Sequence, residues 1–262
     1  MNKSVIKALQ LLDLFVEEQM ELSLSEIAWK TGLSKPTAYR LLSSLAVCGF
    51  LVKVKHSDQD IRYRLGLKLL ELGNIVADQL EIRKIALPSM IKLRDEIDET
   101  VHLVVVDGNE AVYIEKVESK QPLRLYTRVG KRSPLYVGSG PKLLLAFMPE
   151  NKQKDLLETI ELKQITKNTI IDKSVLIQEI KCIKSLGYAV SNGEQDLNTV
   201  GISFPIRNFD GNVIAALAVS GLSLRVLGER YEFIKERTQI ASMEISNNLG
   251  YNQIRKTNKV YL

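Results

Sequence analysis

The segment SKPTAYRLLSSL, residues 34–45, carries three side chains that can form hydrogen bonds from one face of a helix. Thr37, Arg40 and Ser44 follow one another at helical spacing, which places them together on that face. Arginine can donate two hydrogen bonds to guanine, and threonine can contact a base edge or a thymine methyl group. The opposite face is apolar and consists of Ala38, Leu41, Leu42 and Leu45. The segment therefore predicts a helix that packs by one side and presents the other to a groove of DNA.

The residues before this helix predict the turn that positions it. Gly32 allows the chain to reverse after a short helix expected at residues 25–31. Ser34 can cap the next helix, expected at residues 34–48, by accepting a backbone N–H hydrogen bond, and Pro36 falls in the first turn, where proline is tolerated. The side chains suited to contacts with the DNA backbone are Ser34, Lys35 and Tyr39.

A basic hairpin is predicted directly after the helix. The stretch FLVKVKHSDQDIRYRLG has two β-rich arms around the turn residues 57–60, with Lys53 and Lys55 on one arm and Arg62 and Arg64 on the other. Cations that neutralise phosphates release condensed counterions, which contributes strongly to DNA affinity. An ordinary helical hairpin with solvated lysines is the alternative. The turn, the cap, the two-faced helix and the basic hairpin together favour a winged helix-turn-helix.

A family resemblance runs through nearly the whole chain. The stretches SVIKALQLLDLF, LSLSEIAWKTGLSKPTAYRLLSSLAVCGFL and YRLGLKLLELG, followed by RVGKRSPLY, GYAVSNGEQD and NVIAALAVSGL, resemble the IclR family of bacterial transcriptional regulators. The resemblance implies a winged helix-turn-helix DNA-binding domain at residues 1–65, a linker helix at 66–81 and a GAF-like effector-binding domain with an antiparallel sheet at 82–262. It also implies a homodimer or homotetramer that binds a palindromic operator, and we expect a repressor of a metabolic operon.

Residues 67–80 predict a helix with more apolar surface than an isolated connector can hide. Its apolar residues are Leu69, Leu70, Leu72, Ile75, Val76 and Leu80. A second copy of the chain can cover this surface and would bring two DNA-reading helices onto adjacent half-sites. Packing of the helix on its own domains is the alternative. We expect self-association, because the family resemblance implies it too.

The remaining pattern indicates a first helix at residues 5–17 and an α+β domain from residue 82 onward. Two β-hairpins are expected, at residues 101–118 and at 202–221. A further strand is expected at 123–128 and a long closing helix at 224–249. Strands grouped between helices favour an antiparallel sheet.

Composition limits the partners and the location. The chain has 262 residues, of which 45% are hydrophobic, and a net charge of +5, which fits a nucleic-acid partner without requiring one. Cys48 and Cys182 lack metal-ligand spacing and are expected to be small buried side chains. No apolar stretch has the length of a membrane span, and the N-terminus lacks the apolar core of a signal peptide. We therefore expect a cytoplasmic protein with no membrane partner, no metal and no cofactor.

The Gly138-Ser139-Gly140 loop, at the entry to a helix, offers backbone N–H groups and a hydroxyl group that suit a carboxylate or another small anion. A plain glycine-rich turn is the alternative. The family resemblance implies an effector pocket made by this loop, a polar turn and the last hairpin strand. Its candidate residues are Gly138, Ser139, Ser191, Glu194, Gly201, Ala218 and Ser220, together with Arg128, which lies close to the loop in sequence.

The pocket candidates differ from those of family members that bind small α-keto acids. Such members have an acidic residue where Ser191 stands, a cysteine at Gly201 and a serine at Ala218. The loss of hydrogen-bonding groups predicts a less polar or roomier pocket, and an effector other than glyoxylate or pyruvate. His102, inside an apolar strand, is expected to be a packed or rim residue rather than a base or a ligand.

An enzyme or metabolite-binding module, whose N-terminal part only assembles subunits, is the alternative function. Catalysis would require a nucleophile with a base, a metal set or paired carboxylates. The two histidines and two separated cysteines form no such set in the sequence. We therefore expect no catalytic residues, and partners that are double-stranded DNA, a small-molecule metabolite and a second copy of the chain.

Overall fold

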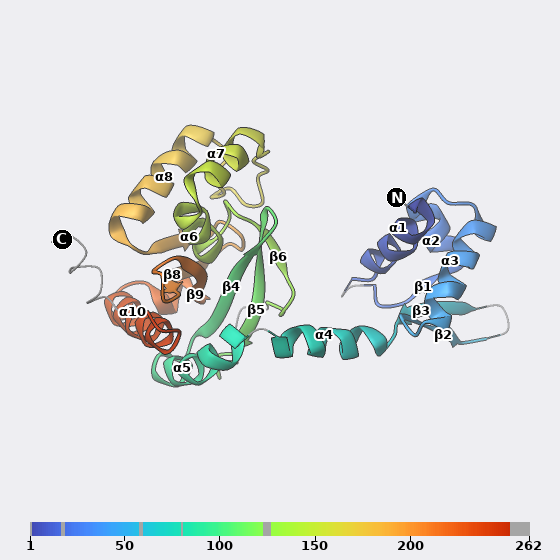
Figure 1. The fold of residues 1–262 in the computed structure, drawn as a ribbon, viewed down its shortest axis with the longest axis horizontal. Helices are drawn as coiled ribbons and strands as arrows, with labels where there is room; N and C mark the ends of the chain where they lie inside the picture. Colours follow the sequence, from blue (N-terminus) through green and yellow to red (C-terminus); the bar gives the residue numbers. More distant parts are fainter. Residues whose placement is uncertain (1, 17–18, 58–59, 80, 123–126, 252–262) are drawn as a thin grey trace. The chain divides into compact units, whose positions relative to one another are not determined.

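The computed structural model describes residues 2–16, 19–57, 60–79, 81–122 and 127–251 (Figure 1). The chain divides into two compact units, Met1–Gln79 and Leu80–Leu262, and each has its own hydrophobic core. Within these described ranges no helix is long and apolar enough to cross a membrane. The same residues contain no group of three or more His, Cys, Asp or Glu side chains that could hold a metal ion.

The first unit combines a helix-turn-helix with a small antiparallel sheet. Its helices are α1 (Lys3–Gln10), the 3-10 helix η1 (Leu12–Leu14), α2 (Leu24–Thr31), α3 (Lys35–Val47) and α4 (Lys68–Gln79). Its strands β1 (Leu22–Ser23), β2 (Leu51–Lys55) and β3 (Ile61–Leu65) pair in the order β1-β3-β2. The core of the unit consists of Leu11, Leu22, Ile27, Leu42, Leu45, Leu51 and Tyr63. The expected winged helix-turn-helix fold is confirmed.

The first helix is shorter than the expected span of residues 5–17. α1 ends at Gln10, and the chain then passes through η1 with Leu11 buried in the core. Val5, Leu9 and Val16, which the sequence pattern places on one broad face, are all exposed. The apolar spacing in the sequence therefore continues beyond the end of the helix.

The turn between α2 and α3 has the conformation that the sequence predicts. α2 begins with a capping box, in which Ser23 Oγ accepts a hydrogen bond from Glu26 N at 3.3 Å and Glu26 Oε2 accepts one from Ser23 N at 2.7 Å. α2 ends at Gly32, whose φ of +67° favours glycine. This cap and this turn together set the direction in which α3 leaves α2.

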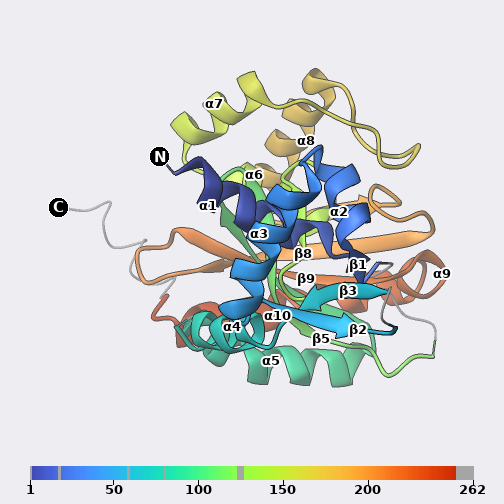
Figure 2. The same ribbon diagram turned by 90° about the vertical axis from the view of Figure 1, so that its right-hand side faces the viewer.

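The second unit is built on a six-stranded antiparallel sheet with the order β6-β5-β4-β9-β8-β7. Its strands are β4 (Thr100–Asp107), β5 (Glu110–Val117), β6 (Arg132–Pro134), β7 (Ala189–Asn192), β8 (Thr199–Arg207) and β9 (Val213–Leu222). Helices α5 (Glu81–Ile97) and α10 (Arg230–Asn248) cover one face of the sheet (Figure 1, Figure 2). Helices α6 (Ser139–Phe147), α7 (Glu150–Thr159) and α8 (Lys173–Leu186) lie on the other face. The α+β class is therefore confirmed.

Both expected hairpins are present, since β4 pairs with β5 and β8 with β9. The helix expected at 224–249 is divided into α9 (Ser223–Val226) and α10, because Gly228 has a φ of +80° that interrupts helical geometry. Most of the strand expected at 123–128 lies outside the described residues. Cys48 and Cys182 are exposed, so the expectation of buried cysteines is wrong.

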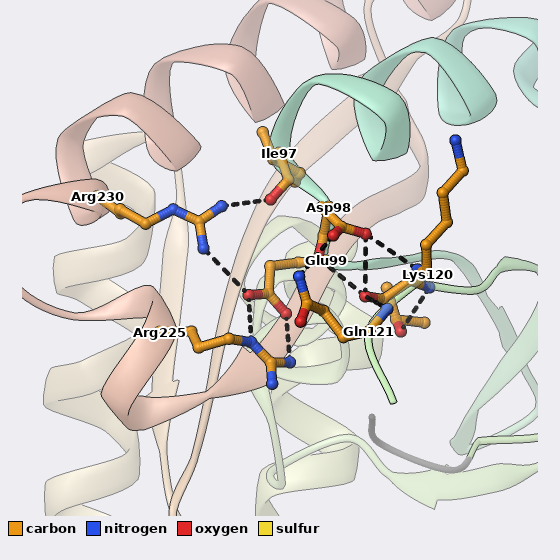
Figure 3. A network of polar contacts seen from close by, with 9 residues as sticks. Ile97, Asp98, Glu99, Lys120, Gln121, Arg225 and Arg230 are labelled. Carbon is orange, nitrogen blue, oxygen red and sulfur yellow. Dashed lines mark hydrogen bonds and ion pairs between the residues drawn. The ribbon is translucent and has the colours of Figure 1, made fainter. Parts of the chain in front are cut away.

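A buried carboxylate fixes the junction between α5 and β4 (Figure 3). Glu99 is fully buried and accepts hydrogen bonds from Arg225 Nε and Nη2, each at 2.9 Å. Arg230 Nη1 lies 3.5 Å from Glu99 Oε1, and Arg230 Nη2 donates to the carbonyl of Ile97. A buried charge requires such partners because it has lost its hydration. The network ties the start of β4 to the segment that follows β9.

Candidate DNA-binding surface and effector pocket

α3 presents the predicted DNA-reading side chains on its outer face. Lys35, Tyr39, Arg40 and Ser44 are exposed and Thr37 is half-buried, whereas Ala38, Leu42 and Leu45 are buried. Ser44 Oγ donates a hydrogen bond to the carbonyl of Arg40 at 3.0 Å. The lone pairs of Ser44 Oγ therefore remain as acceptors for a donor group on DNA.

Ser34 occupies the N-cap position of α3, but its side chain makes no cap hydrogen bond. Ser34 Oγ lies instead 2.9 Å from Thr37 Oγ1, so one hydroxyl group donates to the other. The expected side-chain cap is therefore wrong. The pair orients Thr37 at the start of the outer face and leaves the first N–H groups of α3 without a side-chain cap, as a phosphate site requires.

The register of β2 and β3 divides the four wing cations between two faces. Lys53 and Lys55 lie on the face that carries the buried Tyr63, whereas Arg62 and Arg64 lie on the opposite face. The four cations therefore project from both faces of the wing. Residues 58 and 59 of the predicted turn lie outside the described residues.

Arg62 connects the wing to α2. Its Nε donates to Asp60 Oδ1 at 3.1 Å, and its Nη1 lies 3.6 Å from Glu26 Oε2. Hydrogen bonds from Ser23 and, to a smaller degree, the charge of Arg62 hold the pKa of Glu26 below its ordinary value. Sequence reasoning missed this role. The capping-box spacing of Ser23 and Glu26 was the signal that could have located the carboxylate.

The predicted loop at the start of α6 forms one wall of a small pocket of about 40 Å³. Gly138 is the N-cap residue of α6 and has a φ of +90°, which favours glycine. The first N–H groups of the helix, those of Ser139 and Gly140, have no acceptor within the helix. The pocket is lined by these predicted residues: Gly138, Ser139, Ser191, Gly201, Ala218 and Ser220.

The sheet register brings the strand residues of the pocket together. Ser191 of β7 pairs with Gly201 of β8, which pairs with Ser220 of β9, so all three share one face. A Cβ atom on Gly201 would lie only 2.7 Å from Ser139 Oγ and 2.9 Å from Ser191 Oγ. The hydroxyl groups of Ser139 and Ser191 therefore occupy the space that the side chain of a larger residue at position 201 would need. These two hydroxyl groups make the pocket polar at this position.

Two predicted pocket residues do not line the pocket. Glu194 is buried behind the loop, where its Oε1 lies 2.6 Å from Lys142 Nζ and its Oε2 accepts a hydrogen bond from Gly138 N at 3.0 Å. Lys142 Nζ also lies 2.7 Å from Glu179 Oε1. Glu194 therefore positions the loop. Arg128 is exposed and is not part of the described lining.

The lining also includes residues that sequence reasoning did not assign to the pocket: His102, Tyr113, Thr127, Gln195, Asp196, Thr199 and Val200. Burial lowers the pKa of His102 to about 3, and the charges of Lys116 and Lys131 act in the same direction. Burial raises the pKa of Tyr113 to about 12. Both side chains are therefore neutral near pH 7. The strand alternation, which places His102 on the same face as Val104, was the signal available in the sequence.

A helix-turn-helix with hydrogen-bonding side chains on its outer helix, linked to a second unit with a small polar pocket, defines a DNA-binding regulator with a ligand-binding domain. Residues 4–55 match the family model for the IclR helix-turn-helix domain, and residues 75–247 match the model for the bacterial transcriptional regulator IclR C-terminal domain. The chain belongs to the IclR family of transcriptional regulators. It is therefore a regulator and not an enzyme, and the alternative function is excluded.

Individual relatives agree over nearly the full length. The chain is 41% identical over 250 residues to the HTH-type transcriptional regulator KipR of Bacillus subtilis (strain 168). The aligned region covers 95% of this chain and 98% of that protein. Thermotoga maritima IclR has 35% identity and a TM-score of 0.76, with 95% of this chain and 99% of that chain covered. An IclR homologue from Microbacterium hydrocarbonoxydans, complexed with 4-hydroxybenzoate, has 25% identity and a TM-score of 0.79, with 94% and 99% covered.

Proposed function

We propose that this regulator binds a palindromic operator in double-stranded DNA as a homodimer or homotetramer, and that a small metabolite bound beside α6 changes its affinity for the operator. The observation that carries the proposal is the outer face of α3, where Thr37, Arg40 and Ser44 share one face and the opposite face is buried. We further propose that it represses a metabolic operon in the cytoplasm, because an oligomer bound over a promoter excludes RNA polymerase.

The side chains divide by the part of DNA that they contact. Thr37, Arg40 and Ser44 contact base edges in the major groove. Ser34, Lys35 and Tyr39 contact the DNA backbone at the N-terminal end of α3. Lys53 and Lys55 contact phosphates from one face of the wing, and Arg62 contributes less because it already pairs with Asp60 and Glu26.

Self-association involves α4. Leu70, Ile75 and Val76 of this helix are 62%, 50% and 56% exposed, which is a large apolar surface for one helix. We propose that α4 of a second copy of the chain covers this apolar surface. We also propose that the DNA-binding domain comprises residues 1–65, the connector residues 66–81 and the effector-binding domain residues 82–262. The connector then consists largely of α4.

The effector binds in the pocket beside α6, in contact with Ser139, Ser191 and Ser220. The N–H and hydroxyl groups of the pocket suit a small polar compound. The complex of the Microbacterium homologue with 4-hydroxybenzoate supports a small-molecule ligand. The effector changes operator affinity only as far as its own affinity differs between the DNA-bound and free states.

Fluorescence anisotropy tests this function. The full chain is titrated at fixed salt against duplexes that tile the DNA upstream of its own gene, with excess unrelated DNA present. Tight binding confined to one palindromic duplex is expected, with a stoichiometry of at least two chains per duplex. Equal, weak binding of every duplex, both with and without a metabolite extract, would contradict the proposal.

A further inference from the structure

His102 lines the effector pocket and carries a buried polar atom that has no partner among the described residues. His102 lines the pocket and is 1% exposed. Its Nδ1 atom is buried and has no hydrogen-bond partner among the residues that the structure describes. Leaving such an atom unpaired is unfavourable, so a bound group that pairs with it gains affinity.

The neighbours of His102 explain why this atom is unpaired. His102 stacks edge-on against the ring of Tyr113, with ring centroids 5.4 Å apart, so this contact supplies no partner to Nδ1. Across the sheet, His102 of β4 pairs with Ala218 of β9, and Ala218 pairs with Ser203 of β8. Ser203 Oγ is a second buried polar atom without a partner. Ala218 thus lies between two unpaired polar groups, and its methyl group can bond to neither.

We propose that His102 is a specificity-determining residue of this pocket, and that its Nδ1 atom hydrogen bonds a hydroxyl group of a compact hydroxy acid. The inference rests on the proposed effector function of the pocket. A hydroxyl group can both donate and accept a hydrogen bond, so it satisfies either tautomer of a neutral imidazole. A carbonyl group satisfies only the tautomer that carries hydrogen on Nδ1.

The rest of the pocket favours a small carboxylate. The N-terminus of α6, which lines the same pocket as His102, carries a positive partial charge and N–H donors. The positive charges of Lys116 and Lys131 act on His102 and favour an anion beside the ring, whereas the carboxylate of Asp196 in the same lining opposes one. The pocket volume of about 40 Å³ excludes large ligands and leaves a short-chain acid as the size class that we test.

Matched acids that differ by one hydroxyl group test the proposal. The full chain, labelled with 15N-histidine, is titrated with glycolate against acetate and with lactate against propionate. Calorimetry measures affinity, and NMR follows the imidazole nitrogens. The chain has two histidines, so His56→Gln assigns the signals and serves as the control. We expect the hydroxy acids to bind about tenfold more tightly, a difference of about 1.4 kcal/mol, and to shift His102 Nδ1.

Two variants separate recognition from folding. His102→Phe should reduce the preference for the hydroxy acids to less than about twofold. Ala218→Ser supplies a hydroxyl group between His102 and Ser203, so it should raise the unfolding temperature and weaken hydroxy-acid binding. This second variant keeps the test valid if His102→Phe does not fold.

The outcomes distinguish this inference from the proposed function. Equal calorimetric affinities within each pair, with no shift at the His102 nitrogens, would overturn the role of His102 and leave the pocket in place. No binding of any of the four acids would overturn the hydroxy-acid class. Failure to bind any operator duplex would instead contradict the proposed regulation, whatever the acids do.

Discussion

Replacing Lys142 with methionine should destabilise the second unit, because it removes one partner of a buried ion pair. Lys142 is 1% exposed and Glu194 is 7% exposed. In Lys142→Met, the Glu194 carboxylate keeps its hydrogen bond from Gly138 N but loses the cation 2.6 Å away. Removing one partner of a buried pair costs about 3–5 kcal/mol, and the retained hydrogen bond places this case near the lower limit.

Calorimetric unfolding of the full chain measures this loss. About 3 kcal/mol corresponds to a decrease in Tm of roughly 6–12 °C for a domain of 150–250 residues. Lys163→Met is the control, because Lys163 and its partner Glu161 are both exposed, and such a pair changes Tm by less than about 4 °C. The double variant Lys142→Met/Glu194→Gln should recover most of the loss, because the charge that remains unpaired, on Glu179, belongs to a side chain that is 31% exposed to solvent. Equal Tm values for Lys142→Met and Lys163→Met, or no recovery in the double variant, would refute the reasoning.

Arg40→Ala should weaken specific operator binding much more than non-specific binding, whereas Lys53→Ala should weaken both and reduce the salt slope by about 1. Anisotropy titrations at several salt concentrations measure both effects, and equal losses for Arg40→Ala would contradict base contact. Arg225→Ala should lower the Tm clearly, because Arg225 donates two hydrogen bonds to the buried Glu99. Arg132→Ala removes only exposed ion pairs and serves as the calorimetric control. The pKa of His102 falls from 6.5 to about 3 on folding, so the unfolded chain binds more protons between these values. Stability should therefore decrease as pH falls through this window, by about 1.4 kcal/mol per pH unit. His102→Phe should remove this part of the slope in urea unfolding, and an unchanged slope would contradict a buried neutral imidazole.

The features that the sequence predicted well depend on residues close together in the chain. The turn at Gly32, the two faces of α3 and the glycine loop before α6 follow from spacing within a few residues. Both hairpins also connect neighbouring strands. Local backbone preferences and side-chain periodicity carry this information directly.

The lining of the pocket beside α6 was predicted in part. The glycine loop at residues 138–140 was recognisable from its own residues, whereas the family resemblance was needed to add Ser191, Gly201, Ala218 and Ser220. His102 and Tyr113 were missed because a strand covered on both faces has no exposed side to mark a functional position. Their place in the pocket depends on which helix packs over each face.

By itself, the sequence determined a helix-turn-helix with a hydrogen-bonding outer face and an α+β domain with a glycine loop at a helix entry. Only the tertiary structure decided that Lys53 and Arg62 lie on opposite faces of the wing, because strand register sets those faces. It also decided that Glu194 bonds Lys142, which is 52 residues away in the chain, and so supports the pocket loop. Such contacts depend on how distant elements pack, and no local pattern in a single chain records that packing.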